Sequence, residues 1–144
     1  MTRLQLFWLH LTVALTAITG VVFAVMKYFL KSDDPFSVVN HPLQPHMLAA
    51  HVVVAPFVLF FLGWTFSNHI LPKYRFGNGK NRKTGIGAAL LIVPMALSGY
   101  LLQVSVNETL RDSMAWAHWI TSGVFVSGYV IHLINGRSAD RSCA

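Results

Sequence analysis

Acidic residues are scarce in this chain of 144 residues, and cysteine is almost absent. Five aspartates and glutamates stand against eleven lysines and arginines, and the only cysteine is Cys143 in the C-terminal tail. A single cysteine excludes an intramolecular disulfide and a C-x-x-C redox pair. Charged residues make up 11% of the chain, whereas soluble domains carry about 25%. The composition therefore excludes an ordinary soluble domain and indicates an integral membrane protein.

Four long apolar runs, none containing an aspartate or glutamate, occupy most of the chain. They cover residues 7–30, 47–71, 86–106 and 114–134. Each is long enough to cross about 30 Å of hydrocarbon as a helix. The connections are short, so consecutive spans are expected to be antiparallel neighbours. The sequence predicts a single all-α domain over residues 1–144, folded as a transmembrane up-down-up-down four-helix bundle.

The positive charges are concentrated in one connection, although the net charge of +6 would also suit a nucleic-acid ligand. Residues 72–85 contain five lysines and arginines, namely Lys73, Arg75, Lys80, Arg82 and Lys83. Such a cluster is typical of a cytoplasmic loop. We therefore expect lipid and no nucleic acid as a partner. We also expect a multi-pass membrane protein with this loop and both termini in the cytoplasm.

Two of the seven histidines, His118 and His132, stand fourteen residues apart in the last apolar run. Both rings then project from one helix face, about 21 Å apart at ~1.5 Å per residue. Ionisable side chains inside a membrane are rare and usually functional. Under the expected topology, His51 lies level with His118 near the outer surface. His10 lies about 20 Å deeper at ~1.5 Å per residue, which suits pairing with His132.

Paired histidines at two depths suggest two haems stacked across a membrane. Neutral imidazole is a good ligand for haem iron, and two axial imidazoles leave no open position for oxygen or substrate. We predict that His51 and His118 hold the outer iron and that His10 and His132 hold the inner one. His69 lies about one turn too deep and is the reserve ligand, or a residue near the propionates. The chain has no C-x-x-C-H motif, so the haems would be bound non-covalently.

The remaining polar residues near the span ends have simpler interpretations. His41 and His46 are interpreted as ordinary loop and helix-start residues, with proton handling near a quinol or contact with a partner as the alternative. No cysteine or well-placed acid completes a zinc site with them. Arg3, Lys73 and Arg137 are weak candidates for contacts with haem propionates on the inner side. Each is also a common type of interfacial anchor.

Glycines recur in the middle of the apolar runs, at Gly20, Gly63, Gly99, Gly123 and Gly128. Small residues let membrane helices pack closely. They would also leave room for a flat macrocycle, and the sequence favours neither role over the other.

The histidine pattern resembles that of the two-haem, four-helix membrane cytochromes b. These include bacterial cytochrome b(561) and the cytochrome b subunits of formate dehydrogenases and nickel–iron hydrogenases. In that group the fourth helix carries two histidines about fourteen apart, to which His118 and His132 correspond. Their partners lie early in the second and first helices, as His51 and His10 do. The third helix supplies no ligand, and residues 86–106 contain no histidine.

The resemblance implies two haem b groups and electron transfer across a bacterial inner membrane. Electrons would pass between the quinone/quinol pool and a redox partner at the periplasmic face, such as an iron–sulfur or multihaem cytochrome subunit. With connections this short, we expect the membrane subunit of a respiratory oxidoreductase complex. Quinone reductase or quinol oxidase activity of the chain itself stays open, and no quinone-binding residue is assigned.

Two other classes remain as alternatives. A small four-helix transporter normally couples to protons through a membrane-embedded carboxylate, and the four runs contain none. A cofactor-free membrane anchor would be expected to show histidines scattered in depth.

Overall fold

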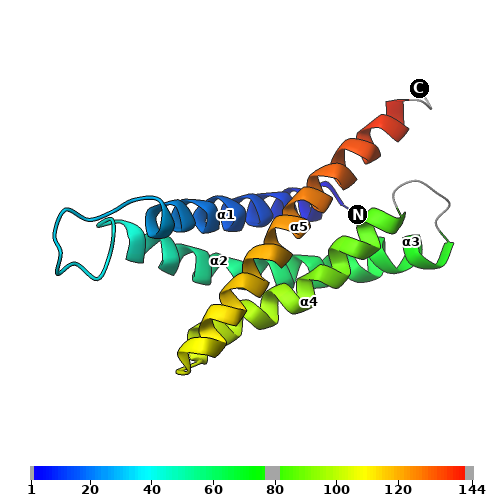
Figure 1. The fold of residues 1–144 in the computed structure, drawn as a ribbon. Coiled ribbons are helices and arrows are strands. Elements are labelled where there is room, and N and C mark those ends of the chain that lie inside the picture. The colour runs from blue at the N-terminus through cyan, green and yellow to red at the C-terminus, as the bar shows by residue number, and fades with distance from the viewer. Residues whose placement is uncertain (1, 77–81, 142–144) are drawn as a thin grey trace. The chain divides into compact units, whose positions relative to one another are not determined.

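The computed structural model describes residues 2–76 and 82–141, with side chains as far as residue 136, and these residues contain helices and no strand. The helices are α1 (Arg3–Tyr28), α2 (Gln44–Thr65), the π-helical turn η1 (Phe66–Ile70), α3 (Leu71–Phe76), α4 (Arg82–Val104) and α5 (Glu108–Arg141) (Figure 1). Because α2, η1 and α3 follow one another without a break, they form one continuous helical segment.

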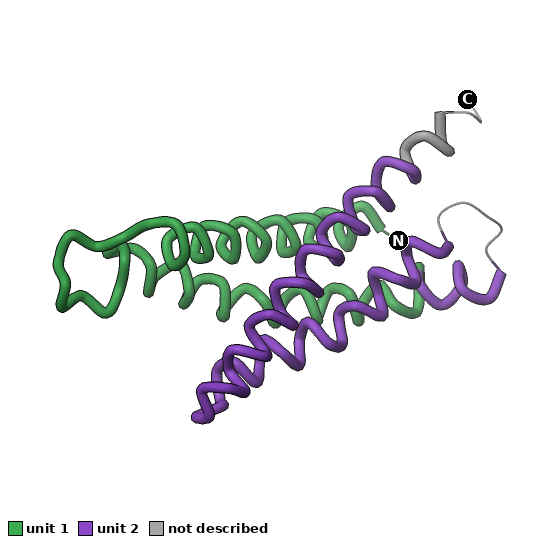
Figure 2. The backbone as a smooth tube through the Cα atoms, in the orientation of Figure 1, with its two compact units in different colours: residues 1–69 green, residues 70–144 purple. Residues whose placement is uncertain are grey.

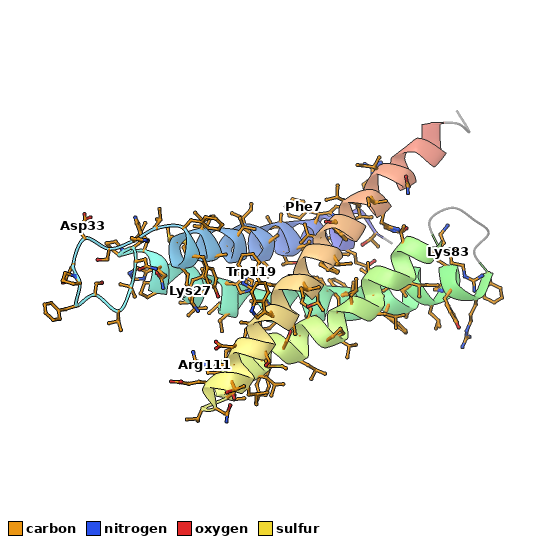
Figure 3. The ribbon with its side chains drawn as sticks, viewed as in Figure 1. Phe7, Lys27, Asp33, Lys83, Arg111 and Trp119 are labelled. Carbon is orange, nitrogen blue, oxygen red and sulfur yellow. The ribbon has the colours of Figure 1, made fainter. Side chains whose placement is uncertain are left out.

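Four helical segments are long and apolar enough to cross a membrane, namely Arg3–Tyr28, Gln44–Phe76, Arg82–Val104 and Glu108–Gly136. This confirms the predicted all-α class and its four candidate spans, and it indicates a multi-pass membrane protein in contact with lipid. Large apolar side chains stay exposed along these helices, among them Val21 at 63% and Leu90 at 67%. Charged side chains such as Lys27, Lys83 and Arg111 lie near helix ends (Figure 3).

Two helices, α1 and α5, begin at polar caps that lie before their apolar runs. At the start of α1, the Thr2 hydroxyl accepts from the Gln5 N–H at 3.2 Å, and the Gln5 side-chain oxygen accepts from the Thr2 N–H at 3.0 Å. This capping box satisfies two backbone donors and starts the helix at Arg3. At the start of α5, the Asn107 side chain accepts from the Leu110 N–H at 2.9 Å. The last span therefore begins well before the predicted residue 114.

The basic connection is also shorter than predicted. Residues 72–76 belong to α3 and residues 82–85 to α4. Lys80 and the rest of residues 77–81 lie outside the described part of the chain. The π-helical turn η1 comes just before Pro72, which has no N–H to donate and whose ring crowds the carbonyl four residues back. A π turn is one way in which a helix accommodates such a break, and it contains His69.

Contacts divide the chain into two compact units, Met1–His69 and Ile70–Ala144 (Figure 2). In unit 1, α1 packs along α2, and in unit 2, α4 packs along α5. Each unit is thus built on a pair of helices that are consecutive spans of the chain. The predicted assembly into one bundle and the expectation of a single domain concern how the units combine, and both stay predictions.

One stripe of α1 faces α2. Its buried residues recur at spacings of three and four, as a helix face requires, at Gln5, Leu9, Thr12, Val13 and Ala24. Near the start of this stripe, the Trp8 ring is stacked with Phe61 of α2, with centroids 5.9 Å apart and planes 5° apart. Thr16 and Gly20 continue the stripe, so the backbone of α1 comes close to α2 at these positions.

Candidate functional site

The four predicted iron ligands lie on three helices, with two in each unit. His10 is on α1 and His51 on α2, both in unit 1, whereas His118 and His132 are on α5 in unit 2. Each predicted pair therefore joins one residue of each unit, and the pairing stays a prediction. The structure describes the surroundings of each ring within its own unit.

His51 is anchored to α1 through its Nδ1 atom. That nitrogen lies 2.9 Å from the carbonyl oxygen of Thr16 and 3.4 Å from the hydroxyl oxygen of Thr19. A carbonyl oxygen only accepts hydrogen bonds, so Nδ1 carries the hydrogen and donates it. In a neutral imidazole the lone pair is then on Nε2. The contact with α1 therefore makes Nε2 the nitrogen that is able to bind a metal.

His118 has the same arrangement in the other unit. Its Nδ1 lies 2.9 Å from the carbonyl oxygen of Met95 and 3.4 Å from the hydroxyl oxygen of Ser98, both on α4. The carbonyl again requires Nδ1 to donate. Although the third membrane helix supplies no histidine, it determines which ring nitrogen of His118 carries the proton.

His132 is also held by α4, through a side chain. Its Nδ1 lies 3.2 Å from the hydroxyl oxygen of Thr84. A hydroxyl both donates and accepts, so this contact alone is compatible with either tautomer. With a metal on Nε2, the Nδ1–H would donate to Thr84.

Each of these three rings also lies against a glycine of the neighbouring helix. A Cβ atom added to Gly20 would be 2.9 Å from Cε1 of His51. At Gly99 the distance to Cε1 of His118 would be 3.0 Å, and at Gly85 the distance to Cε1 of His132 would be 3.1 Å. The Nε2 atoms would be farther away, at 3.7 Å, 3.9 Å and 3.9 Å respectively. The Nδ1–Cε1 edge thus faces the glycine in all three cases.

The structure revises the depth of His10. Because Gly20 lies against the His51 ring, His10 is ten residues along α1 from that level, or about 15 Å at ~1.5 Å per residue. His69 is eighteen residues from His51, or about 27 Å. The spacing of His118 and His132 corresponds to about 21 Å, midway between the two. The assignment of His10 therefore depends on the family resemblance, since depth does not separate it from His69.

The cations that were predicted near the propionates are at helix ends. Arg3 is exposed in the first turn of α1, and Lys73 is exposed in α3. Arg137 lies in α5, but its side chain is outside the described residues, as is the whole of Cys143. Close to Lys73, the guanidinium carbon of Arg82 lies 5.3 Å from the Tyr74 ring centroid, which suits a cation–π contact.

The anchored histidines have the donor atoms that a haem iron takes from a protein. Among the described residues, no group of three histidine, cysteine, aspartate or glutamate side chains could hold an ion. A haem iron takes only axial ligands from the protein, because the porphyrin nitrogens supply the remaining donors. Single histidines with an anchored Nδ1 fit that requirement.

Sequence reasoning located the histidines but missed the residues that hold them. Thr16, Thr19, Thr84 and Ser98 were not singled out. For the last three, the available signal was that each directly precedes a glycine. Of the glycines noted in the sequence, Gly20 and Gly99 make room for histidine rings. An added Cβ at Gly63, Gly123 or Gly128 would have no neighbour within 4 Å among the described atoms, which is compatible with space for a macrocycle.

Comparison with known proteins yields no match with a family model, a curated protein or a solved structure.

Proposed function

We propose that this chain is a dihaem b-type cytochrome that carries electrons across a bacterial inner membrane. The observation that supports this most directly is the shared environment of His51 and His118. In each, Nδ1 donates to a backbone carbonyl of the adjacent helix at 2.9 Å, and Nε2 keeps the lone pair. Histidines that bind metals through one nitrogen commonly donate from the other to such a carbonyl. The resemblance to the membrane cytochromes b points the same way.

The protein side of this proposal assigns each histidine a role. His51 and His118 would hold one iron near the outer surface, and His10 and His132 would hold the other nearer the cytoplasm. When bound, each haem supplies a reversible one-electron iron couple whose potential depends on ligand hydrogen bonds and burial. The carbonyls of Thr16 and Met95 orient two of the rings, and the apolar side chains of the spans would keep water from a bound haem.

The proposed partners lie at the two membrane surfaces. The connection between α4 and α5 spans only residues 105–107, which leaves no room there for a separate catalytic domain. We therefore propose a membrane subunit of a respiratory oxidoreductase complex. It would exchange electrons with quinone or quinol and with a periplasmic iron–sulfur or multihaem cytochrome subunit. The basic residues at the α3–α4 connection favour a cytoplasmic position for that end.

The test is a reduced-minus-oxidised absorption spectrum of the detergent-purified protein, with haem quantified per polypeptide. A b-type α band with two haems per chain supports the proposal, and reduction of both by a quinol would support the link to quinone. A single haem would mean that one histidine pair is wrong. A colourless protein from a host that supplies haem would refute the proposal and favour the anchor or the transporter.

A further inference from the structure

Helix α4 repeats a short motif at the same spacing as the histidines of α5. Thr84–Gly85 and Ser98–Gly99 are fourteen residues apart, as are His118 and His132. Gly99 lies against His118 and Gly85 against His132, so the two helices run antiparallel with one register over nearly four turns. A helix without histidines thus places a hydroxyl residue and a glycine against both histidines of its neighbour.

A third copy occurs in the other unit, on a different pair of helices. Thr19–Gly20 of α1 faces His51 of α2. The carbonyl that accepts from the histidine lies three residues before the hydroxyl residue, at Thr16 for His51 and at Met95 for His118. Ser122–Gly123 and Ser127–Gly128 share the dipeptide, but a Cβ added to either glycine would have no described atom within 4 Å. The dipeptide therefore contacts a histidine only where the register between two packed helices places a histidine of the neighbouring helix next to it.

The hydroxyl group is itself oriented by the helix that carries it. Thr19 donates its hydroxyl hydrogen to the Leu15 carbonyl at 2.8 Å, and Ser98 donates to the Pro94 carbonyl at 2.7 Å. A hydroxyl has one hydrogen to donate, so its oxygen is left as an acceptor toward the histidine. At His51 and at His118, the carbonyl and the hydroxyl together form a two-oxygen acceptor for one Nδ1–H, and the glycine lets the ring edge reach it.

We propose that α4 is a positioning helix, in which Thr84–Gly85 and Ser98–Gly99 hold the Nδ1 edges of His132 and His118. They fix the angle of each ring and the electron donation of its Nε2. Thr19–Gly20 does the same for His51. This inference rests on the proposed function. A hydrogen bond from Nδ1 makes Nε2 a stronger donor, which favours oxidised iron and lowers the midpoint potential.

The test is made at the His132 site, with two variants and a matched control in the full-length protein. Thr84→Val removes the hydroxyl and keeps the side-chain shape, whereas Gly85→Ala adds a Cβ 3.1 Å from the ring. Gly87→Ala is the control, because the same change two residues along α4 meets no described atom within 4 Å. Haem per chain, the redox titration of the α band and the electron paramagnetic resonance of the ferric protein are measured.

We expect Thr84→Val to keep both haems and to raise the midpoint potential of one. Gly85→Ala should weaken binding of that haem about 10–100-fold, as the loss of a partner that orients a ligand typically does, and should change its resonance. Gly87→Ala should match the wild type. If Gly85→Ala does not fold, the midpoint potentials of Thr84→Val alone test the positioning role.

The outcomes separate the inference from the proposed function. If the wild type holds two haems and Thr84→Val has unchanged potentials, the positioning role is refuted and the cytochrome assignment stands. If Gly87→Ala changes as much as Gly85→Ala, the effect belongs to helix packing in general, and the positioning role is again refuted. A wild type without haem refutes both.

Discussion

The imidazole of His51 lies so close to Gly20 that a Cβ atom at Gly20 would be 2.9 Å from Cε1 of the ring. The contact joins α1 to α2 at the position where Nδ1 of His51 donates to the Thr16 carbonyl. The missing side chain of Gly20 therefore leaves the space in which the Nδ1–Cε1 edge of His51 packs. The same relationship at Gly99 and Gly85 in the other unit makes it a recurring feature of this chain.

Gly20→Ala should cost the protein one haem, that of His51 and His118. Alanine is favoured over glycine in a helix by about 1 kcal/mol, so local helix stability should not fall. The new methyl group instead displaces the ring from the Thr16 carbonyl. Haem quantification with a redox titration checks this, with Gly87→Ala as the control. Two haems with unchanged potentials in Gly20→Ala would contradict it.

His51→Ala and His118→Ala should remove the same haem. Each leaves that iron with one axial ligand, and the double variant should lose no more haem than either single variant. The remaining haem should titrate at the same potential in all three proteins, because it keeps both of its histidines. His132→Ala should leave the other haem, with a different potential. If the double variant lost both haems, the predicted pairing of His51 with His118 would be wrong.

The orientation of the chain can be tested by labelling single cysteines from one side of the membrane. In a Cys143→Ser background, Val38→Cys places a thiol at a residue that is 99% exposed in the first connection. Arg75→Cys places one in α3, just before the basic connection. An impermeant maleimide added to intact cells with a permeable outer membrane should label the first and not the second. The opposite labelling would reverse the predicted topology.

Hydropathy was enough to predict the four spans, because each apolar residue contributes to membrane insertion nearly independently of its neighbours in space. It did not predict where the helices end, because that depends on individual polar contacts such as the Thr2–Gln5 capping box and the Asn107 cap. The helices therefore extend beyond their apolar runs at both of these sites.

The histidine surroundings were harder to predict for a different reason. Spacing along one helix places His118 and His132 on a common face, but the residues that meet them come from α4. Which residues those are depends on the register between two helices, and the sequence does not state it. Gly99 was noted as a small residue, while Ser98 and the Met95 carbonyl acquired a role only when His118 was found 3.4 Å and 2.9 Å from them.

Helix geometry does not decide between His10 and His69 as the inner ligand. The separation of His10 from the level of His51 is shorter than the spacing of His118 and His132, and the separation of His69 from His51 is longer by about the same amount. His10 lies on a regular part of α1, and the membrane cytochromes b that the histidine pattern resembles take a ligand early in the first helix. His69 lies in the π-helical turn before Pro72, and π turns often mark functional sites.

We expect His10→Ala to lose the same haem as His132→Ala, and His69→Ala to keep both. His69→Gln is the matched milder variant, since it keeps a polar side chain in the turn and should also retain both haems. If His69→Ala and His69→Gln each lost one haem while His10→Ala kept two, then the π turn would supply the inner ligand.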